Sequence, residues 1–462
     1  MNHNGEFRPS PIKELPVELL RMILGVLPDV PSLHAAVLSC SMFYRAFLEA
    51  ETSITTQVLL NQIDVDVVAE ATIASKSALL RPHDPDPKSR EAILDFVAQN
   101  LQQRPAPPTA WSLQKALHLG RLHFHVDALA KKFVATTLSR HPLNQSSHLV
   151  TDQEICRIER ALYRFEIYCN LFREVSDVGS PIYDEQGSLY FAHFAPYENE
   201  QLGCIHDFLI RAITPAFNDV AEHDVSWGAW NVDYIFDLDS PWAQYILSLG
   251  LQKLCEISSA ETYEERYRAL DATKCPSVTP SFLHEGFEIA SERNNDVFLE
   301  DLTPENETLH IKSPFFKDPD PGPLDAWRWA HLEETRSNWV YQEDRKELRE
   351  WGYVIWDRVR LEAVGIFDGS WRDMVSARDL TLERQNIGRE QAYMQNSWEK
   401  REEIRRAGGS GWWSWGDESK VKWKGGVAPW EKPSIPRIAK PDSLQEAREL
   451  LSMMKLPPST RK

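Results

Sequence analysis

The sequence has no uninterrupted apolar run that is long enough to cross a membrane. A spanning helix needs about 20 predominantly apolar residues, and no run of even about 18 occurs in the chain. The first residues, MNHNGEFRPSP, also lack a positive cluster that leads into an apolar stretch, so we expect no signal peptide. We therefore expect no membrane partner.

The chain also has few cysteines and lacks the common catalytic motifs. The six cysteines are scattered and form no CxxC pair, which is typical of reduced thiols in a cytoplasmic or nuclear protein. The HExxH, GxSxG and GxGxxG motifs and the phosphate-binding loop are absent. We therefore expect a non-catalytic protein without cofactor or metal, in the cytoplasm, the nucleus or both. An enzyme of unfamiliar helical type is the alternative.

One segment is similar to a metal-binding motif. His123, His125 and Asp127 match HxHxD, the opening of the metal motif of metallo-β-lactamases, but Ala128 follows and no closing histidine does. The surrounding residues have a helical pattern, and residues two apart on a helix point about 200° away from each other. His123 and His125 therefore cannot share a metal ion, and we expect them to be surface or helix-packing residues.

The N-terminal segment 15–27 is strongly apolar. Only Glu18, Arg21 and Gly25 in it are neither proline nor large apolar side chains. A helix that is apolar nearly all round is buried on more than one side. A unit of about 40 residues cannot bury that much surface alone. The segment is therefore predicted to dock onto a partner, and the alternative is an N-terminal core hairpin.

Three short helices are expected in this region. Pro16 stands where the first helical residue is expected, because its missing N–H costs nothing there. The proline-containing stretch 27–32 interrupts the helix, since proline disfavours helical geometry in the residue before it. Asp29 or Ser32 can cap a second helix, and Phe43 belongs to a third.

This pattern resembles an F-box. The family signature is an LPxE opening, a first helix rich in Ile or Leu, a proline-containing turn, a second helix led by Leu, and Cys followed by an aromatic residue. Phe43 stands here where tryptophan is common in the family. The residues that the resemblance assigns to adaptor binding are Leu15, Pro16, Glu18, Leu19, Ile23, Leu27, Leu33, Val37, Cys40 and Phe43.

The resemblance implies binding to the Skp adaptor of cullin–RING ubiquitin ligases, and through it to a cullin. Segments 157–172 and 348–361 are similar to helices of fungal-type F-box proteins whose helical C-terminal region has no assigned ligand. No repeat of about 20 to 50 residues is visible, so leucine-rich, WD and kelch arrays are not expected. The expected function is a substrate receptor for an unknown protein. An adaptor-bound scaffold without cullin is the alternative.

The net charge of −18 is unevenly distributed. Residues 219–307 hold 19 acidic and 5 basic residues, whereas residues 372–462 hold 18 basic and 13 acidic ones. Nucleic-acid binding needs clustered Lys and Arg. We therefore expect no nucleic-acid partner. The acidic segment 219–307 either attracts a basic substrate or only keeps the protein surface well hydrated.

Most of the remaining chain has helical periodicity, so an all-α fold is predicted. Thr151 and Glu154 fit a capping box that opens a long helix. Residues 176–200 indicate an irregular loop or a small hairpin. Further helices are expected at 112–140, 200–221, 242–258, 260–270, 281–292 and 443–454. The expected regions are an F-box (11–60), a helical linker region with Pro-rich breaks (61–111), a helical receptor domain (112–313), a Trp-rich helical region (324–406) and a mostly irregular tail (407–462).

The tail is rich in tryptophan and glycine. Its tryptophans at 412, 413, 415, 423 and 430 alternate with lysines at 420, 422 and 424. Such a mixture either stacks on a ligand or clamps an extended tail onto the helical body. The glycines in 408–411 are expected to form a flexible linker, because no Lys-Ser/Thr follows to complete a phosphate loop.

Overall fold

The structure is a computed structural model. It describes residues 15–80, 87–140, 142–145, 147–173, 185–272, 282–290, 297–375, 380–426 and 448. In these ranges helices dominate, and the two strands span two residues each. The predicted all-α fold class is confirmed. Residues 81–86 of the expected linker region and the expected helix at 443–454 lie outside the described residues, Arg448 excepted.

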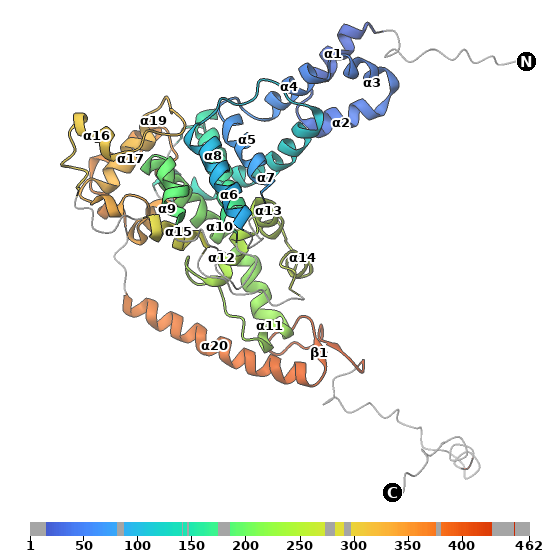
Figure 1. Ribbon diagram of the computed structural model, residues 1–462. Helices are drawn as coiled ribbons and strands as arrows, with labels where there is room; N and C mark the ends of the chain where they lie inside the picture. The colour runs from blue at the N-terminus through green and yellow to red at the C-terminus, as the bar shows by residue number, and fades with distance from the viewer. Residues whose placement is uncertain are drawn as a thin grey trace, which may run out of the picture. The chain divides into compact units, whose positions relative to one another are not determined.

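The N-terminal helices form a compact group in which α1 packs on α3 and α4, and α2 packs on α3, α4 and α7 (Figure 1). Asp29 caps α2, because its Oδ1 accepts a hydrogen bond from the Ser32 backbone N–H at 2.7 Å. Pro16 precedes the first helix and does not belong to it. The bounds are α1 Val17–Gly25, α2 Val30–Ser39, α3 Ser41–Leu48 and α4 Glu51–Gln62.

The helical body is built around α8, in which 16 of 21 residues are buried. The capping box at its start is confirmed: the Thr151 hydroxyl accepts from the Glu154 N–H, and the Glu154 carboxylate accepts from the Thr151 N–H at 3.0 Å. Helices α5 and α7 pack on α8. The bounds are α5 Val68–Ser77, α6 Pro87–Val97, a π-helical turn Ala98–Gln102, α7 Leu113–Thr137, a 3₁₀ turn Leu143–Gln145 and α8 Asp152–Phe172.

The next segment contains short helices where a loop or hairpin was expected. Residues 185–193 form helical turns, so the hairpin alternative is wrong for that part. Gly250, with φ of 85°, divides the helix expected at 242–258 into α12 and α13. The bounds are α9 Gln186–Leu189, a 3₁₀ turn Phe191–His193, α10 Pro196–His223, α11 Val225–Ala229, α12 Pro241–Ser248, α13 Leu251–Ser258, α14 Tyr263–Ala269 and α15 Phe282–Ala290.

The Trp-rich region after residue 300 consists of short helices joined by turns. Trp327, Trp339 and Trp356 are fully buried in it and provide much of its apolar core. The bounds are α16 Pro304–His310, α17 Gly322–His331, α18 Lys346–Glu350 and α19 Arg358–Ala363, with 3₁₀ turns at Arg336–Asn338, Glu343–Arg345, Ile366–Asp368 and Trp371–Met374.

The chain divides into two compact units, one of residues 1–220 and 233–388 and one of residues 221–232 and 389–462. The second unit includes α11, the C-terminal part of α20 (Leu380–Arg406) and an antiparallel pair, β1 (Gly409–Ser410) with β2 (Lys422–Trp423). The linker expected at 408–411 therefore contains a strand. Glycine is required at 409, because a Cβ there would lie 2.5 Å from Ile404 Cγ2. The five regions expected from the sequence remain a prediction.

The tryptophans of the second unit pack inside that unit. Trp413 is buried with Val225, Ile404 and Val421, and Trp423 packs against this cluster. Packing within the second unit thus explains the presence of Trp413 and Trp423 without a ligand. The ligand-binding interpretation remains a prediction for Trp415, which is 47% exposed. Trp430 lies outside the described residues.

Replacing Trp413 with alanine is expected to destabilise the second unit by about 3–5 kcal/mol, the usual effect of removing a buried tryptophan. The half-exposed Trp415 provides the matched control, with an expected cost of about 1 kcal/mol. Thermal unfolding of both variants measures the difference. An unchanged melting temperature for Trp413→Ala would contradict the packing interpretation.

Candidate functional site

One side of α1 is both apolar and exposed. The inward side is formed by Leu20 and Leu24, which are buried. The outward side carries apolar residues with the i, i+3, i+4, i+7 spacing of a helical stripe: Leu19, Met22, Ile23 and Val26. Val26 keeps 70% of its surface accessible. The helix is therefore apolar on two sides, one packed inside the unit and one left uncovered.

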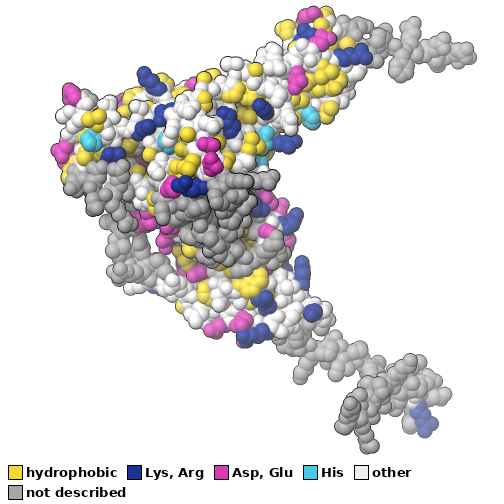
Figure 2. All heavy atoms as spheres, in the orientation of Figure 1, with side chains coloured by type: hydrophobic (Ala, Val, Ile, Leu, Met, Phe, Trp, Pro, Cys, Tyr) yellow, Lys and Arg dark blue, Asp and Glu magenta, His cyan; other side chains and the backbone are white. Residues whose placement is uncertain are grey.

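Further exposed apolar residues lie on the next two helices: Leu38 on α2, and Tyr44 and Leu48 on α3. We call these three residues together with Leu19, Met22, Ile23 and Val26 the apolar face. Figure 2 shows hydrophobic side chains gathered on the part of the surface that α1–α3 form. Grouped exposed apolar residues of this kind mark interaction sites in proteins.

The structure separates the ten residues predicted to bind the adaptor into three groups. The exposed ones are Pro16, Glu18, Leu19 and Ile23. The partly buried ones are Leu15, Leu27 and Cys40. The buried ones are Leu33, Val37 and Phe43. Because the last three are covered by their own chain, they hold the helices together and do not form the surface.

Two amides of α4, which the sequence reasoning missed, fix the turn between α1 and α2. Asn61 Nδ2 donates to the carbonyls of Gly25 and Leu27 at 2.8 and 3.0 Å. Gln62 accepts from the Val30 N–H at 3.1 Å and donates to the Gly120 carbonyl at 3.0 Å. These bonds join α1, α2 and α7 through α4, so the outward side of α1 has a fixed orientation relative to the body. The spacing of the amides in the sequence gives no signal for these long-range partners.

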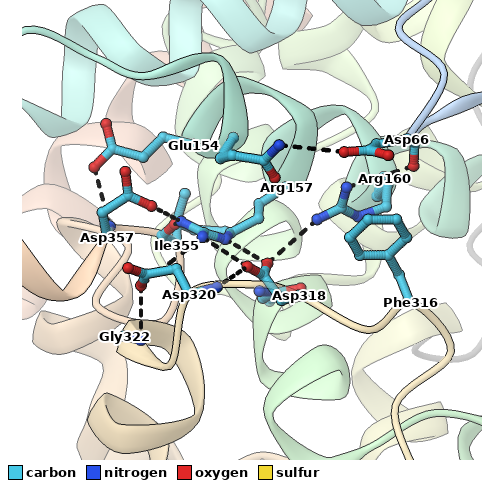
Figure 3. Close-up of polar contacts among 12 residues, drawn as sticks. Asp66, Glu154, Arg157, Arg160, Phe316, Asp318, Asp320, Gly322, Ile355 and Asp357 are labelled. Carbon is cyan, nitrogen blue, oxygen red and sulfur yellow. Dashed lines mark hydrogen bonds and ion pairs between the residues drawn. The ribbon is translucent and has the colours of Figure 1, made fainter.

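Figure 3 shows a polar cluster that surrounds Arg157 of α8. Its guanidinium is fully buried and bonds both oxygens of Asp318, at 2.6 and 2.8 Å, Asp357 at 2.6 Å and the Ile355 carbonyl at 3.0 Å. The partners follow Arg157 in sequence by 161 to 200 residues. Arg157 thus holds the loop after residue 314 and the segment before α19 onto α8. Burial alone would raise the pKa of Asp318, but Arg157 lowers it below its ordinary value.

Two more buried arginines bind carboxylates in the same unit. Arg164 of α8 pairs with Glu198 at 2.8 Å and with Glu70 at 3.1 Å. Arg349 pairs with Asp207 at 2.7 Å, and Arg349 holds the pKa of Asp207 below its ordinary value although burial alone would raise it. Such pairs connect helices that are distant in sequence, and we assign them a structural role.

The histidines of the HxHxD segment lie on α7, as the helical pattern predicted. His123 is buried, its Nδ1 lies 3.0 Å from the Tyr163 hydroxyl, and its Nε2 lies 4.0 Å from Glu159. Burial lowers the pKa of His123 to about 4, so the ring is neutral at pH 7. Within the described residues, no group of three or more His, Cys, Asp or Glu side chains is placed to hold a metal ion.

His123→Gln is expected to make the fold less sensitive to acid. The folded pKa of about 4 is lower than the ordinary 6.5, so the folded state binds this proton less readily than the unfolded one. Its contribution to stability is complete above pH 6.5 and falls as the pH drops towards 4, by about 3 kcal/mol. Unfolding of both proteins in urea at pH 7 and pH 4 measures the difference. Equal losses would contradict this assignment. Burial raises the pKa of Glu159 to about 7, which acts in the opposite direction, and this residue is retained in both proteins.

Comparisons of the chain with protein-family models, curated proteins and solved structures give no match. The function must therefore be argued from the residues and their geometry. None of the helices in the described ranges is long and apolar enough to span a bilayer. The apolar face of α1–α3 is the candidate interaction surface.

Proposed function

We propose that the chain is the substrate-receptor subunit of a Skp–cullin–F-box ubiquitin ligase. The apolar face of α1–α3 supports this proposal, because it lies on the segment whose sequence resembles an F-box. In this proposal the Skp adaptor covers that face. Burying a large aliphatic side chain that was fully exposed contributes about 1.5–3 kcal/mol, and each of the four residues of the outward side of α1 contributes the part of this that corresponds to its exposed surface.

The buried residues Leu33, Val37 and Phe43 have a supporting role in this proposal. They pack α2 and α3 against α1 and α4, and this packing fixes the helices that carry the exposed residues. Preorganised helices lose little conformational entropy on binding. The partly buried Leu15, Leu27 and Cys40 lie at the edge of the contact.

The chemistry of ubiquitin transfer belongs to other subunits in this proposal. The receptor holds a target protein near the loaded enzyme, which raises the effective concentration of the target lysine. The helical body that begins near Ser112 carries the target, whose identity the sequence does not reveal. The cytoplasm or the nucleus remains the proposed location.

Co-purification from cells tests the assembly. The full chain is expected to recover both the Skp adaptor and a cullin, whereas the Leu19→Ala/Ile23→Ala variant recovers neither. Recovery of the adaptor without any cullin would favour the scaffold alternative. Recovery of neither by a folded wild-type chain would refute the proposal.

A further inference from the structure

A cavity of about 350 Å³ in the helical body is lined by four basic side chains, one acidic side chain and an apolar wall. It lies between α7, α10 and the α13–α14 region, within one compact unit. The four basic residues are Lys132, Arg140, Arg211 and Arg266. This concentration of positive charge is notable in a chain of net charge −18.

Three of the four cations already have partners. Lys132 donates to the Ser258 carbonyl. Arg140 pairs with Glu350 at 3.3 Å at the half-exposed rim. Arg266 pairs with Asp219 at 3.0 Å. These contacts hold the side chains in place around the cavity and leave further guanidinium donors for a ligand.

Arg211 is the exception. Its Nη1 is buried and has no hydrogen-bond partner. Asp207 lies near it in sequence, but its oxygens already accept from Arg349 at 2.7 Å and from Tyr341 at 3.1 Å. The Arg211 side chain as a whole is only partly buried, and its unpartnered Nη1 is an unsatisfied donor that costs free energy. Burial lowers the pKa of Arg211, and the neighbouring Arg140 lowers it further, against the opposing effects of Asp207 and Glu350.

A proline of α10 also borders the cavity. Pro215 lies inside α10 and lines the cavity. Proline has no N–H to donate to the carbonyl four residues earlier, which is that of Arg211. Helices bend at such positions. Phe208, Ala212 and Ile257 add an apolar wall beside the cations.

We propose that this cavity binds a small molecule that carries a phosphate group. Phosphate matches the planar guanidinium donors of the arginines that line the cavity. The apolar wall would hold the organic part of the molecule. The volume is within the range of small-ligand sites. This inference goes beyond adaptor docking and does not depend on it.

The test measures binding of inorganic phosphate and phenyl phosphate to the full chain by calorimetry and by thermal unfolding, at constant ionic strength. Both probes are expected to bind and to raise the melting temperature, phenyl phosphate more strongly because its ring reaches the apolar wall. Arg211→Met is expected to weaken both affinities by about 10- to 100-fold, the effect of losing charge-assisted hydrogen bonds. Without ligand, this variant is expected to melt close to the wild-type temperature, because methionine fills most of the same space and the lost Nη1 has no hydrogen-bond partner.

Arg372→Met is the matched control, since Arg372 is an exposed arginine that pairs with Glu333 on the same unit. It should bind both probes like the wild type. Failure of both probes to bind the wild-type chain would overturn the proposal, and so would equal binding by Arg211→Met. Binding of a phosphoserine peptide, with no binding of the free probes, would also overturn it in favour of a protein ligand.

Discussion

Replacing Ile23 and Val26 with aspartate is expected to abolish binding of the Skp adaptor while the chain stays folded. Both side chains belong to the outward stripe of α1, and neither is buried in the free protein. In the complex each would have to carry a charge into an apolar contact. Ile23 is 39% and Val26 70% exposed, so losing both anchors removes about 2–3 kcal/mol and lowers affinity by about 10- to 100-fold, and the two charges lower it further. A titration of purified adaptor against wild type and variant measures this change.

The control places the same two charges elsewhere on the same unit. Leu149 and Leu309 are 89% and 78% exposed, and neither belongs to the apolar face. The Leu149→Asp/Leu309→Asp variant should bind the adaptor as the wild type does. Equal binding by the Ile23→Asp/Val26→Asp variant would show that the apolar face is not the contact.

Arg157→Met is expected to lower the free energy of unfolding by about 3–5 kcal/mol, which is the usual effect of removing one partner of a buried ion pair. Methionine fills most of the same space, so the loss is mainly electrostatic. Asp318 and Asp357 would remain close together without their shared cation. Chemical denaturation of variant and wild type at pH 7 measures the effect.

A surface ion pair of similar length provides the control. Lys131 pairs with Asp127 at 2.7 Å on the exposed side of α7. Lys131→Met is expected to change stability by no more than about 0.5 kcal/mol, because solvent screens this pair. If Arg157→Met were as stable as Lys131→Met, the cluster in Figure 3 would not hold the fold together.

Local signals in the sequence predicted the helices well. Asp29 and the Thr151 capping box act through residues three positions away, so their geometry can be recognised from the sequence alone. The helical periodicity of the segment around His123 likewise predicted a helix there, and the structure places this segment in α7. The all-α fold follows from such short-range patterns.

The sequence does not show which apolar side of the N-terminal helices is buried and which is exposed. Leu19 and Leu33 are the same residue type, yet Leu19 is exposed and Leu33 is buried. The difference depends on which side the body covers, and that depends on long-range contacts such as those of Asn61 and Gln62. Met22 and Val26 were missed for the same reason.

The ion pairs between residues distant in sequence could not be predicted from the sequence either. The arginines at positions 157, 160 and 164 have the spacing of a solvated helix surface, but all three are buried in α8. Their carboxylate partners lie on other elements, such as Asp318, 161 residues after Arg157. Pairing over such distances depends on the tertiary fold and leaves no periodic pattern.

Hydrogen–deuterium exchange of the full chain with and without purified Skp adaptor tests the central claim most directly. The account predicts a stable complex in which the amides of Val17–Leu48 become protected, while those of α8 keep their exchange rates. Absence of a complex with a folded chain, or protection confined to other segments, would contradict it.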